Sequence, residues 1–321
     1  MTRTLAPFDL PSWKESVAAA ADKHGKFAVA SPSATTVAPT PSTTPVAPVI
    51  KPIATRGGRC IRPNGEEYFP RKVSIGGLKT TDVDFLRTAY AERKSALFSG
   101  APGCGKTALV EGALDDVITL QGSLDTESAD LEGTWVQSPD GTYNWEDGPL
   151  VRAAEKGVPF LIDEMALIDS RALASTYSLM DGRGVLNVSA NPLRPPVVAK
   201  DGFVVYGCYN PDVPGAVVSD AMLSRFTLKV DFTTDWKVAA RLGVCTEAVT
   251  VAQNLNIKAV NNEISAAPQL RELIAFRDVE RIYGLDVAIA NLLSFAHPED
   301  MSAYQEAAQA IWAKMPKPLT F

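Results

Sequence analysis

Apolar runs alternate with helical stretches from about residue 66 onward. This alternation is typical of an open parallel α/β sheet, in which helices connect buried strands. The apolar runs predict five strands, at Ala96–Ser99, Val117–Leu120, Val158–Ile162, Phe203–Cys208 and Phe226–Val230. We therefore expect an α/β fold built on a five-stranded parallel sheet.

The pattern becomes helical after the fifth strand. Asp235 is suited to cap the first of these helices, and no further strand is expected beyond it. One helix is predicted to bury a single apolar face and to end near Gly284. That face consists of Leu270, Leu273, Ile274, Val279 and Ile282. A small all-helical domain is therefore expected to follow the sheet.

The first 65 residues have a different composition. Residues 31–49 contain only Pro, Ser, Thr, Ala and Val, which is typical of an extended linker. Before it, Ser12 and Glu15 have the spacing of a capping box, and a short helix there could either dock onto a partner or fray. We divide the chain into a tail with this short helix (1–30), a linker and lead-in (31–65), an α/β core (66–234) and a helical lid with C-terminal helices (235–321).

Composition and charge narrow the function classes. The net charge of −6 gives no support to nonspecific nucleic-acid binding, although a local basic patch stays open. The four cysteines lie far apart without zinc-ligand spacing, so free thiols are expected; for Cys104 a lowered pKa with a redox role is the alternative. No apolar run approaches the roughly 20 residues of a membrane span, and no signal-peptide pattern is present. We expect a cytoplasmic protein without membrane insertion.

Residues Gly100–Thr107 match the phosphate-loop pattern G-x-x-x-x-G-K-[ST] at every fixed position, directly after a predicted strand. Such a loop turns backbone N–H groups toward a phosphate, and the dipole of the following helix, Lys106–Leu114, points to the same place. We expect Lys106 to reach the β- and γ-phosphates and Thr107 to supply a hydroxyl ligand to Mg²⁺. The expected nucleotide-binding residues are Gly100, Ala101, Pro102, Gly103, Cys104, Gly105, Lys106, Thr107 and Ala108.

Two carboxylates, Asp163 and Glu164, end the third predicted strand. Side chains at the carboxyl end of a parallel strand face the crevice where ligands bind. Asp163 is therefore expected to hold Mg²⁺, directly or through water. Glu164 is expected to polarise the water that attacks the γ-phosphate.

Two further polar residues follow. Asn210 ends the fourth predicted strand, where its amide could orient the attacking water or contact the γ-phosphate, or could simply form a turn with Pro211. Arg225 precedes the fifth strand, where its guanidinium could stabilise a phosphoryl transition state or pair with a surface acid.

The order of these elements resembles that of the AAA+ ATPases, in particular the MoxR-like branch with the CbbQ and NorQ types, a dynein-related, AAA_5-like subfamily. The resemblance covers about residues 66–285. The matching segments are Tyr68–Arg71, the phosphate loop, Asp130–Gly133, Asp147–Ala153, Leu161–Glu164, Asn210–Pro211 and Leu223–Phe226.

The resemblance implies roles for these residues. The phosphate loop and the acid pair correspond to Walker A and Walker B, Asn210 to sensor 1, and Arg225 to an arginine finger that acts on ATP bound by the adjacent subunit. It also implies ATP rather than GTP, a ring that is commonly a hexamer, and a partner with a von Willebrand factor A domain. Arg271 matches the sensor 2 arginine if Glu272 and Leu273 anchor the alignment, but lies about two positions late if Pro268 does.

Two insertions are predicted to form hairpins. Thr134–Trp145 has Asp140-Gly141 at its turn and aromatic residues on its arms. The second runs from Val185–Val188 to Val197-Val198, through a segment rich in proline. In ring ATPases of this branch such inserts face the pore or the partner; the alternative is that they only extend the fold.

These features favour a Mg²⁺-dependent ATPase that forms a ring and remodels a protein partner as a chaperone or activase. One alternative is an oligomeric scaffold that ATP assembles and slow hydrolysis resets. Another is a nucleic-acid-stimulated motor, which the acidic charge disfavours but Arg194 and Lys200 in the second insert keep open.

Overall fold

In a computed structural model, residues 60–313 and 317–320 are described. The predicted N-terminal helix and the linker up to residue 59 lie outside these residues, so those expectations stay predictions.

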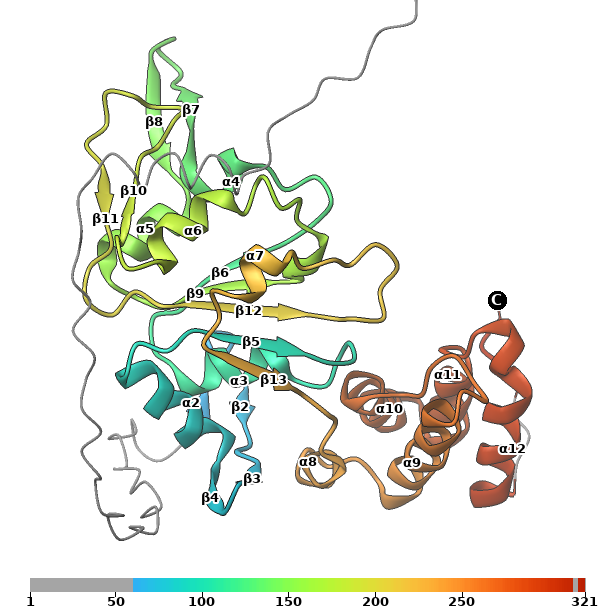
Figure 1. The fold of residues 1–321 in the computed structure, drawn as a ribbon. Helices are drawn as coiled ribbons and strands as arrows, with labels where there is room; N and C mark the ends of the chain where they lie inside the picture. The colour runs from blue at the N-terminus through green and yellow to red at the C-terminus, as the bar shows by residue number, and fades with distance from the viewer. Residues whose placement is uncertain (1–59, 314–316, 321) are drawn as a thin grey trace, which may run out of the picture. The chain divides into compact units, whose positions relative to one another are not determined.

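A five-stranded parallel sheet forms the centre of the α/β part (Figure 1). Its spatial order is β13-β5-β12-β9-β6, so the strand before the phosphate loop lies between two later strands. The strands are β5 (Ala96–Ser99), β6 (Ile118–Gln121), β9 (Phe160–Asp163), β12 (Val205–Tyr209) and β13 (Leu228–Asp231). The predicted α/β fold with five parallel strands is confirmed, with four strands beginning one or two residues later than expected.

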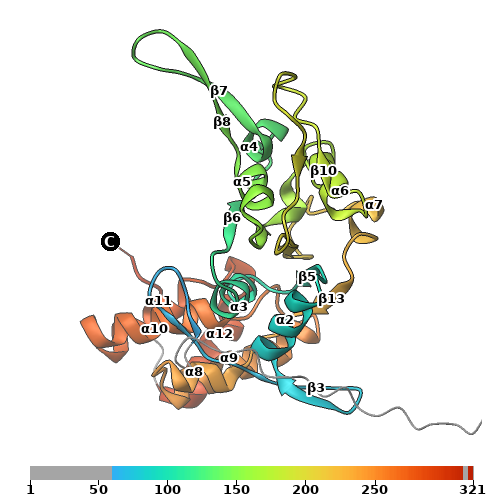
Figure 2. The ribbon, with the colours of Figure 1, turned by 90° about the vertical axis from the view of Figure 1, so that its left-hand side faces the viewer.

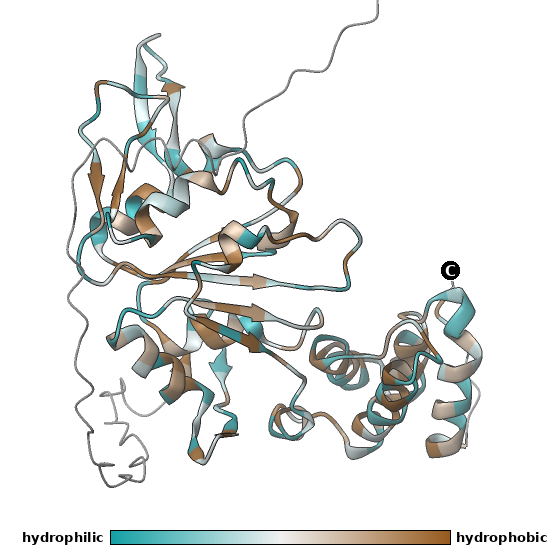
Figure 3. Ribbon diagram, viewed as in Figure 1, coloured by the Kyte–Doolittle hydropathy of each residue, from teal (hydrophilic) through white to brown (hydrophobic). Residues whose placement is uncertain are grey.

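Helices cover both faces of the sheet because alternate strand residues point to opposite sides. On one side Phe98 packs with residues of α2 (Asp82–Ala91) and α3 (Lys106–Ala113). On the other side Leu97, Phe160 and Ile162 pack with residues of α5 (Pro149–Lys156) and α6 (Ala174–Met180). Figure 3 shows the apolar strands between these two helical layers.

Short strands and helices complete the α/β part. The segment before α2 forms two antiparallel pairs on the α2 and α3 side: β1 (Cys60–Ile61) with β2 (Glu67–Tyr68), and β3 (Lys72–Ile75) with β4 (Leu78–Thr81). The remaining elements are α4 (Ser128–Glu132), the 3-10 turn η1 (Met165–Leu167) and α7 (Asp220–Leu223).

Both inserts form antiparallel hairpins, as predicted. The first pairs β7 (Gly133–Gln137) with β8 (Tyr143–Asp147), and its arms extend beyond α4 (Figure 2). The second pairs only two residues on each arm, β10 (Val185–Leu186) with β11 (Val197–Val198). Pro195 and Pro196, directly before β11, cannot donate to the ladder.

A helical bundle follows β13. Its helices are α8 (Trp236–Arg241), α9 (Thr246–Val260), α10 (Leu270–Tyr283), α11 (Leu285–Leu293), η2 (Pro298–Asp300) and α12 (Met301–Trp312). The Asp235 side chain caps α8 by accepting a hydrogen bond from the Lys237 N–H, as expected. The helices share one apolar core of their own.

The predicted apolar face of α10 is wrong at one residue, Ile282. Leu270 and Leu273 are buried, but Ile282 is 61% exposed. Ile282 lies nine residues after Leu273, which is two and a half helical turns, so it faces the opposite side. Phe276 is buried instead and stacks on Trp312 with ring centroids 5.7 Å apart.

Candidate nucleotide-binding site

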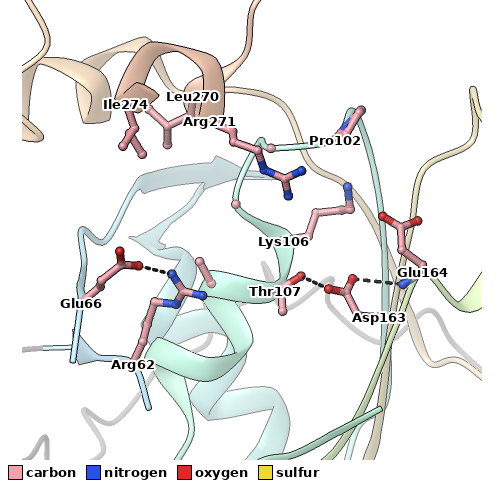
Figure 4. Close-up of a pocket in the computed structure, with 13 residues that line it drawn as sticks. Arg62, Glu66, Pro102, Lys106, Thr107, Asp163, Glu164, Leu270, Arg271 and Ile274 are labelled. Carbon is pink, nitrogen blue, oxygen red and sulfur yellow. Dashed lines mark hydrogen bonds and ion pairs between the residues drawn. The ribbon is translucent and has the colours of Figure 1, made fainter. Parts of the chain in front are cut away.

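A cavity of about 350 Å³ lies where β5 and β9 end, next to the start of α10 (Figure 4). Four separate segments of the chain line it. Its residues are Arg62, Glu66, Pro102, Gly103, Gly105, Lys106, Thr107, Ala108, Asp163, Glu164, Leu270, Arg271 and Ile274. The fold therefore brings together nine of the expected site residues, namely Pro102, Gly103, Gly105, Lys106, Thr107, Ala108, Asp163, Glu164 and Arg271.

The phosphate loop is held closely on two sides, which explains two of its glycines. Gly100 has a φ of +151°, and a Cβ there would lie 2.1 Å from the Phe232 carbonyl oxygen. Gly103 has a φ of +76°, and a Cβ there would lie 2.8 Å from the Cβ of Arg271. Neither backbone position accommodates a side chain.

The Lys106 ammonium lies within the loop. It is only 6% exposed as a residue, and its Nζ donates to the carbonyl oxygens of Gly100 at 2.8 Å and Ala101 at 3.0 Å. This holds a positive charge at the mouth of a loop whose helix also presents its positive dipole end. The region suits an anionic group.

Thr107 and Asp163 are in direct contact. Thr107 Oγ1 donates to Asp163 Oδ2 over 2.8 Å, and the Glu164 N–H donates to Asp163 Oδ1 over 3.1 Å. A hydroxyl beside a carboxylate provides two hard oxygen donors of the kind that Mg²⁺ prefers. The described residues contain no group of three or more His, Cys, Asp or Glu side chains that could hold a metal. These two residues fit Mg²⁺ only with further ligands from phosphate or water.

Glu164 has an unusual backbone. Its φ of 49° and ψ of 39° are left-handed, a conformation that costs a non-glycine residue on the order of 1–3 kcal/mol. The conformation ends β9 abruptly and turns the Glu164 carboxylate into the cavity beside Asp163 (Figure 4). Strained residues of this kind often serve a site.

Asn210 follows β12, the strand between β5 and β9. It is buried, and its Oδ1 accepts a hydrogen bond of 3.1 Å from the Asp212 N–H. The residue does not line the cavity. The turn-forming contact that the sequence left open is therefore present.

Arg225 lies away from the cavity, at the amino end of the sheet. Its carbonyl oxygen accepts from Ser95 Oγ, just before β5, while the phosphate loop lies after β5. The guanidinium lies 4.2 Å from the Tyr177 ring centroid and donates to the Ala221 carbonyl oxygen. Within residues 60–313 and 317–320, no carboxylate forms an ion pair with it, so the expected alternative of a surface ion pair is not observed.

Cys104 is an occupant of the loop rather than a reactive thiol. Its side chain is fully buried, and burial raises the pKa of the thiol despite the nearby charge of Lys106. The thiolate is therefore disfavoured, and the alternative of a lowered pKa is wrong.

Arg71 supports the site and was not among the expected site residues. Its guanidinium donates to the Cys104 carbonyl oxygen at 2.5 Å and to the Thr233 carbonyl oxygen at 2.8 Å. It also lies 4.3 Å from the centre of the Phe232 ring. Arg71 thus connects the phosphate loop to the segment that leads into the helical bundle. The matching segment Tyr68–Arg71 was the only signal for it.

A buried carboxylate holds Arg71. Asp82 accepts from the Arg71 N–H and from the Tyr68 hydroxyl, and its Oδ2 lies 3.9 Å from Arg71 Nε. Burial raises the pKa of Asp82, opposed by these hydrogen bonds. This network of Tyr68, Arg71 and Asp82 could not be predicted from the sequence, because no local pattern indicates that these residues are in contact.

Arg62 and Glu66 also line the cavity, and neither was among the expected site residues. Arg62 pairs with Glu66 at 2.6 Å and with Glu111 on α3 at 2.9 Å. A second cavity of about 330 Å³ adjoins the first here. Apolar side chains of the segment before α2 and of the helical bundle line much of it, including Phe69, Val238 and Leu242.

Residues 95–226 match the family model described as "AAA domain (dynein-related subfamily)". These residues are therefore similar to an AAA domain. The match begins just before β5 and ends at Phe226, so it contains the phosphate loop, the acid pair, Asn210 and Arg225. The helical bundle with Arg271 lies beyond the matched residues.

Similar proteins support this family. The chain is 29% identical over 140 residues to the protein CbbQ of Hydrogenophilus thermoluteolus, covering 42% of this chain and 51% of CbbQ. It is 28% identical over 136 residues to the denitrification regulatory protein NirQ of Stutzerimonas stutzeri, covering 40% and 48%. Midasin of Giardia intestinalis is 31% identical over 143 residues, covering 43% of this chain and 3% of midasin. The chain thus spans about half the length of CbbQ and NirQ, and the expected MoxR-like resemblance is confirmed.

The helices flanking and following the matched residues are short. Across the described part of the chain, none is both long and apolar enough to cross a membrane.

Proposed function

We propose that this protein binds and hydrolyses ATP with Mg²⁺ and works as a ring that remodels a protein partner. The observation that carries the proposal is the convergence of Lys106, Thr107, Asp163 and Glu164 on one cavity beneath Arg271. A phosphate loop, a metal-binding hydroxyl–carboxylate pair and a candidate base are the groups that phosphoryl transfer to water requires.

Each residue has a distinct task in this proposal. Lys106, now on the loop carbonyls, would bind the β- and γ-phosphates. Thr107 and Asp163 would hold Mg²⁺, which would supply positive charge to offset that of the phosphate oxygens. Glu164 accepts a proton from the attacking water. Arg271 contacts the γ-phosphate from the lid, and Asn210 orients the water once its turn contact with Asp212 is exchanged.

The adjoining cavity suits the nucleoside. Its volume of about 330 Å³ and its apolar lining from the segment before α2 and the lid fit a purine ring. The choice of ATP over GTP comes from the family alone.

Arg225 motivates the ring. It lies at the amino end of the strands, whereas the phosphate loop lies at the carboxyl end, so it is suited to a nucleotide held by a neighbouring subunit. We propose a hexamer in the cytoplasm, with the core at 66–234, the lid at 235–321 and a von Willebrand factor A domain protein as one class of partner. These features rest on the family resemblance.

ATP hydrolysis tests the proposal directly. Wild-type protein should release phosphate only with Mg²⁺, and Lys106→Ala should lose nucleotide binding. Glu164→Gln should bind ATP normally but hydrolyse it at least about 100-fold more slowly. Equal Mg²⁺-dependent turnover in all three proteins would refute it. Slow wild-type turnover with strong ATP-dependent assembly would favour the scaffold instead.

Mixed rings test Arg225. Arg225→Ala and Lys106→Ala subunits should each be inactive alone and regain some activity when mixed, since one supplies the site and the other the arginine. Absence of rescue at every ratio would exclude action across the interface.

A further inference from the structure

Two side chains of opposite charge, Arg62 and Glu66, lie where the two cavities adjoin. Both residues line the first cavity together with the phosphate loop, and both line the second cavity with its apolar walls. Figure 4 shows them on one side of Thr107, with Asp163 and Glu164 on the other side. The pair therefore lies at the end of the site that is away from the candidate metal ligands and base.

The covalent order of a nucleotide indicates which of its groups belongs at this boundary. In the proposed function the first cavity holds the phosphates and the second holds the base. Ribose connects the two, so it belongs beside the residues that line both cavities, which include Arg62, Glu66 and Ala108. The hydrogen-bond donors of this part of a nucleotide are the 2′- and 3′-hydroxyls, and a carboxylate is a suitable acceptor for them.

The Glu66 carboxylate is held through one of its two oxygens. Oε2 accepts from Arg62 Nη1 at 2.6 Å and from Asn64 Nδ2 at 2.9 Å. Within the described part of the chain, no donor contacts Oε1. The side chain is 67% exposed, so a ligand can reach this oxygen.

Arg62 fixes the carboxylate relative to the phosphate loop. Its Nε and Nη2 donate to Oε2 of Glu111 at 3.1 Å and 2.9 Å. Glu111 lies on α3, the helix that begins with Lys106 at the end of the loop. The guanidinium also offsets the negative charge that Glu66 would otherwise place beside the phosphates. The acceptor is therefore preorganised, which lowers the cost of binding.

We propose that Glu66 is a specificity-determining residue that accepts a hydrogen bond from a ribose hydroxyl, with Arg62 positioning its carboxylate. The site thereby selects ribonucleotides over deoxyribonucleotides. A hydrogen bond to an ionised acceptor is stronger than one between neutral groups, and a site built around it rejects a ligand that lacks the donor. The proposal rests on the proposed function, because it names the group by which the same site selects its nucleotide.

Isothermal titration calorimetry with ADP, 2′-deoxy-ADP and 3′-deoxy-ADP tests this proposal, since none of these ligands has a γ-phosphate to lose. Wild type should bind ADP about fivefold more tightly than at least one of the two deoxy forms. Glu66→Ala should bring the three affinities to within about twofold of one another, chiefly by weakening ADP. Glu66→Gln keeps an acceptor oxygen without the charge, so its selectivity should fall between those two.

Glu92 provides the matched control. It is exposed at the end of α2 and lines neither cavity, so Glu92→Ala should keep the selectivity of wild type. Arg62→Met should lose selectivity as Glu66→Ala does, and wild-type selectivity in this variant would overturn the positioning role. A residue needed only for folding would weaken all three ligands by the same factor. Such a uniform loss in Glu66→Ala, or equal affinities in wild type, would overturn the proposal.

The ATPase rate of wild type separates this proposal from the proposed function. Equal affinities for ADP and both deoxy forms with normal ATP hydrolysis refute only the ribose contact. Ribose selection without ATP hydrolysis refutes only the proposed ATPase.

Discussion

The Thr107 hydroxyl donates a 2.8 Å hydrogen bond to the Asp163 carboxylate, across 56 positions of sequence. This contact joins the first turn of α3 to the end of β9, on the far side of β12 in the sheet. The phosphate loop and the acid pair therefore contact each other directly. The same pair of oxygens is what we expect Mg²⁺ to bind.

Removing either oxygen should weaken Mg²⁺ binding more than it lowers the stability of the fold. We expect Thr107→Val and Asp163→Asn to weaken Mg²⁺-dependent nucleotide binding about tenfold or more, because each removes one hard ligand. Thr107→Ser keeps the hydroxyl and serves as the control. Titration of a fluorescent nucleotide with and without Mg²⁺ measures this, and an unchanged Mg²⁺ effect in Thr107→Val would contradict it.

Arg71 should matter for both stability and nucleotide binding. Arg71→Met should lower the free energy of unfolding by roughly 2–4 kcal/mol, because it leaves two carbonyl oxygens and buried Asp82 without their cation. Arg71→Lys should be more stable than Arg71→Met, because it keeps a cation near Asp82. It should bind nucleotide more weakly than wild type, since an ammonium cannot reach both carbonyls at once. Urea unfolding and nucleotide titration measure the two effects.

Arg93 provides the comparison for Arg71. Its ion pair with Asp201 is 2.6 Å long but exposed, so Arg93→Met should change the free energy of unfolding by no more than about 0.5 kcal/mol. A similar loss in both methionine variants would indicate that the contacts of Arg71 contribute no more to stability than an exposed ion pair does.

Arg271 should contribute to nucleotide binding from the lid. It lines the cavity and lies against Gly103, so Arg271→Ala should weaken ATP binding or slow hydrolysis about tenfold without a change in melting temperature. Arg281 lies on the same helix and is exposed, so Arg281→Ala is the matched control. Identical kinetics in the two variants would contradict a role for Arg271 in nucleotide binding or hydrolysis.

The Arg194–Asp147 pair should stabilise the inserts in a pH-dependent way. Hydrogen bonding to Arg194 lowers the pKa of Asp147. A lowered folded-state pKa stabilises the protein above the ordinary aspartate value near 4, and this contribution is lost as pH falls through the folded-state pKa. Arg194→Met should therefore cost roughly 1 kcal/mol at neutral pH, and the difference from wild type should shrink below about pH 4.

Urea unfolding at several pH values checks this prediction. Arg171→Met removes a similar ion pair that is exposed, with Asp169, and should have no measurable effect. A difference between Arg194→Met and wild type that grows toward acid pH would contradict the assigned sign.

Local patterns made much of the fold predictable. The three central strands, β5, β9 and β12, were visible because a strand buried on both faces needs a continuous apolar run. The strand β9 started late because Val158 and Pro159 remain in the turn after α5. Ile282 was misplaced although the helical period by itself puts it two and a half turns from Leu273, on the opposite face of α10.

By itself, the sequence determined the five strands, the phosphate loop, the acid pair and both hairpins, since each depends on spacing within a few residues. Only the tertiary structure decided which distant residues complete them. Arg71 reaches across 33 positions to Cys104 and 162 to Thr233, and Arg194 reaches across 47 to Asp147. Contacts at such separations depend on how the sheet orders its strands and where the helices pack, and neither leaves a local trace in the chain.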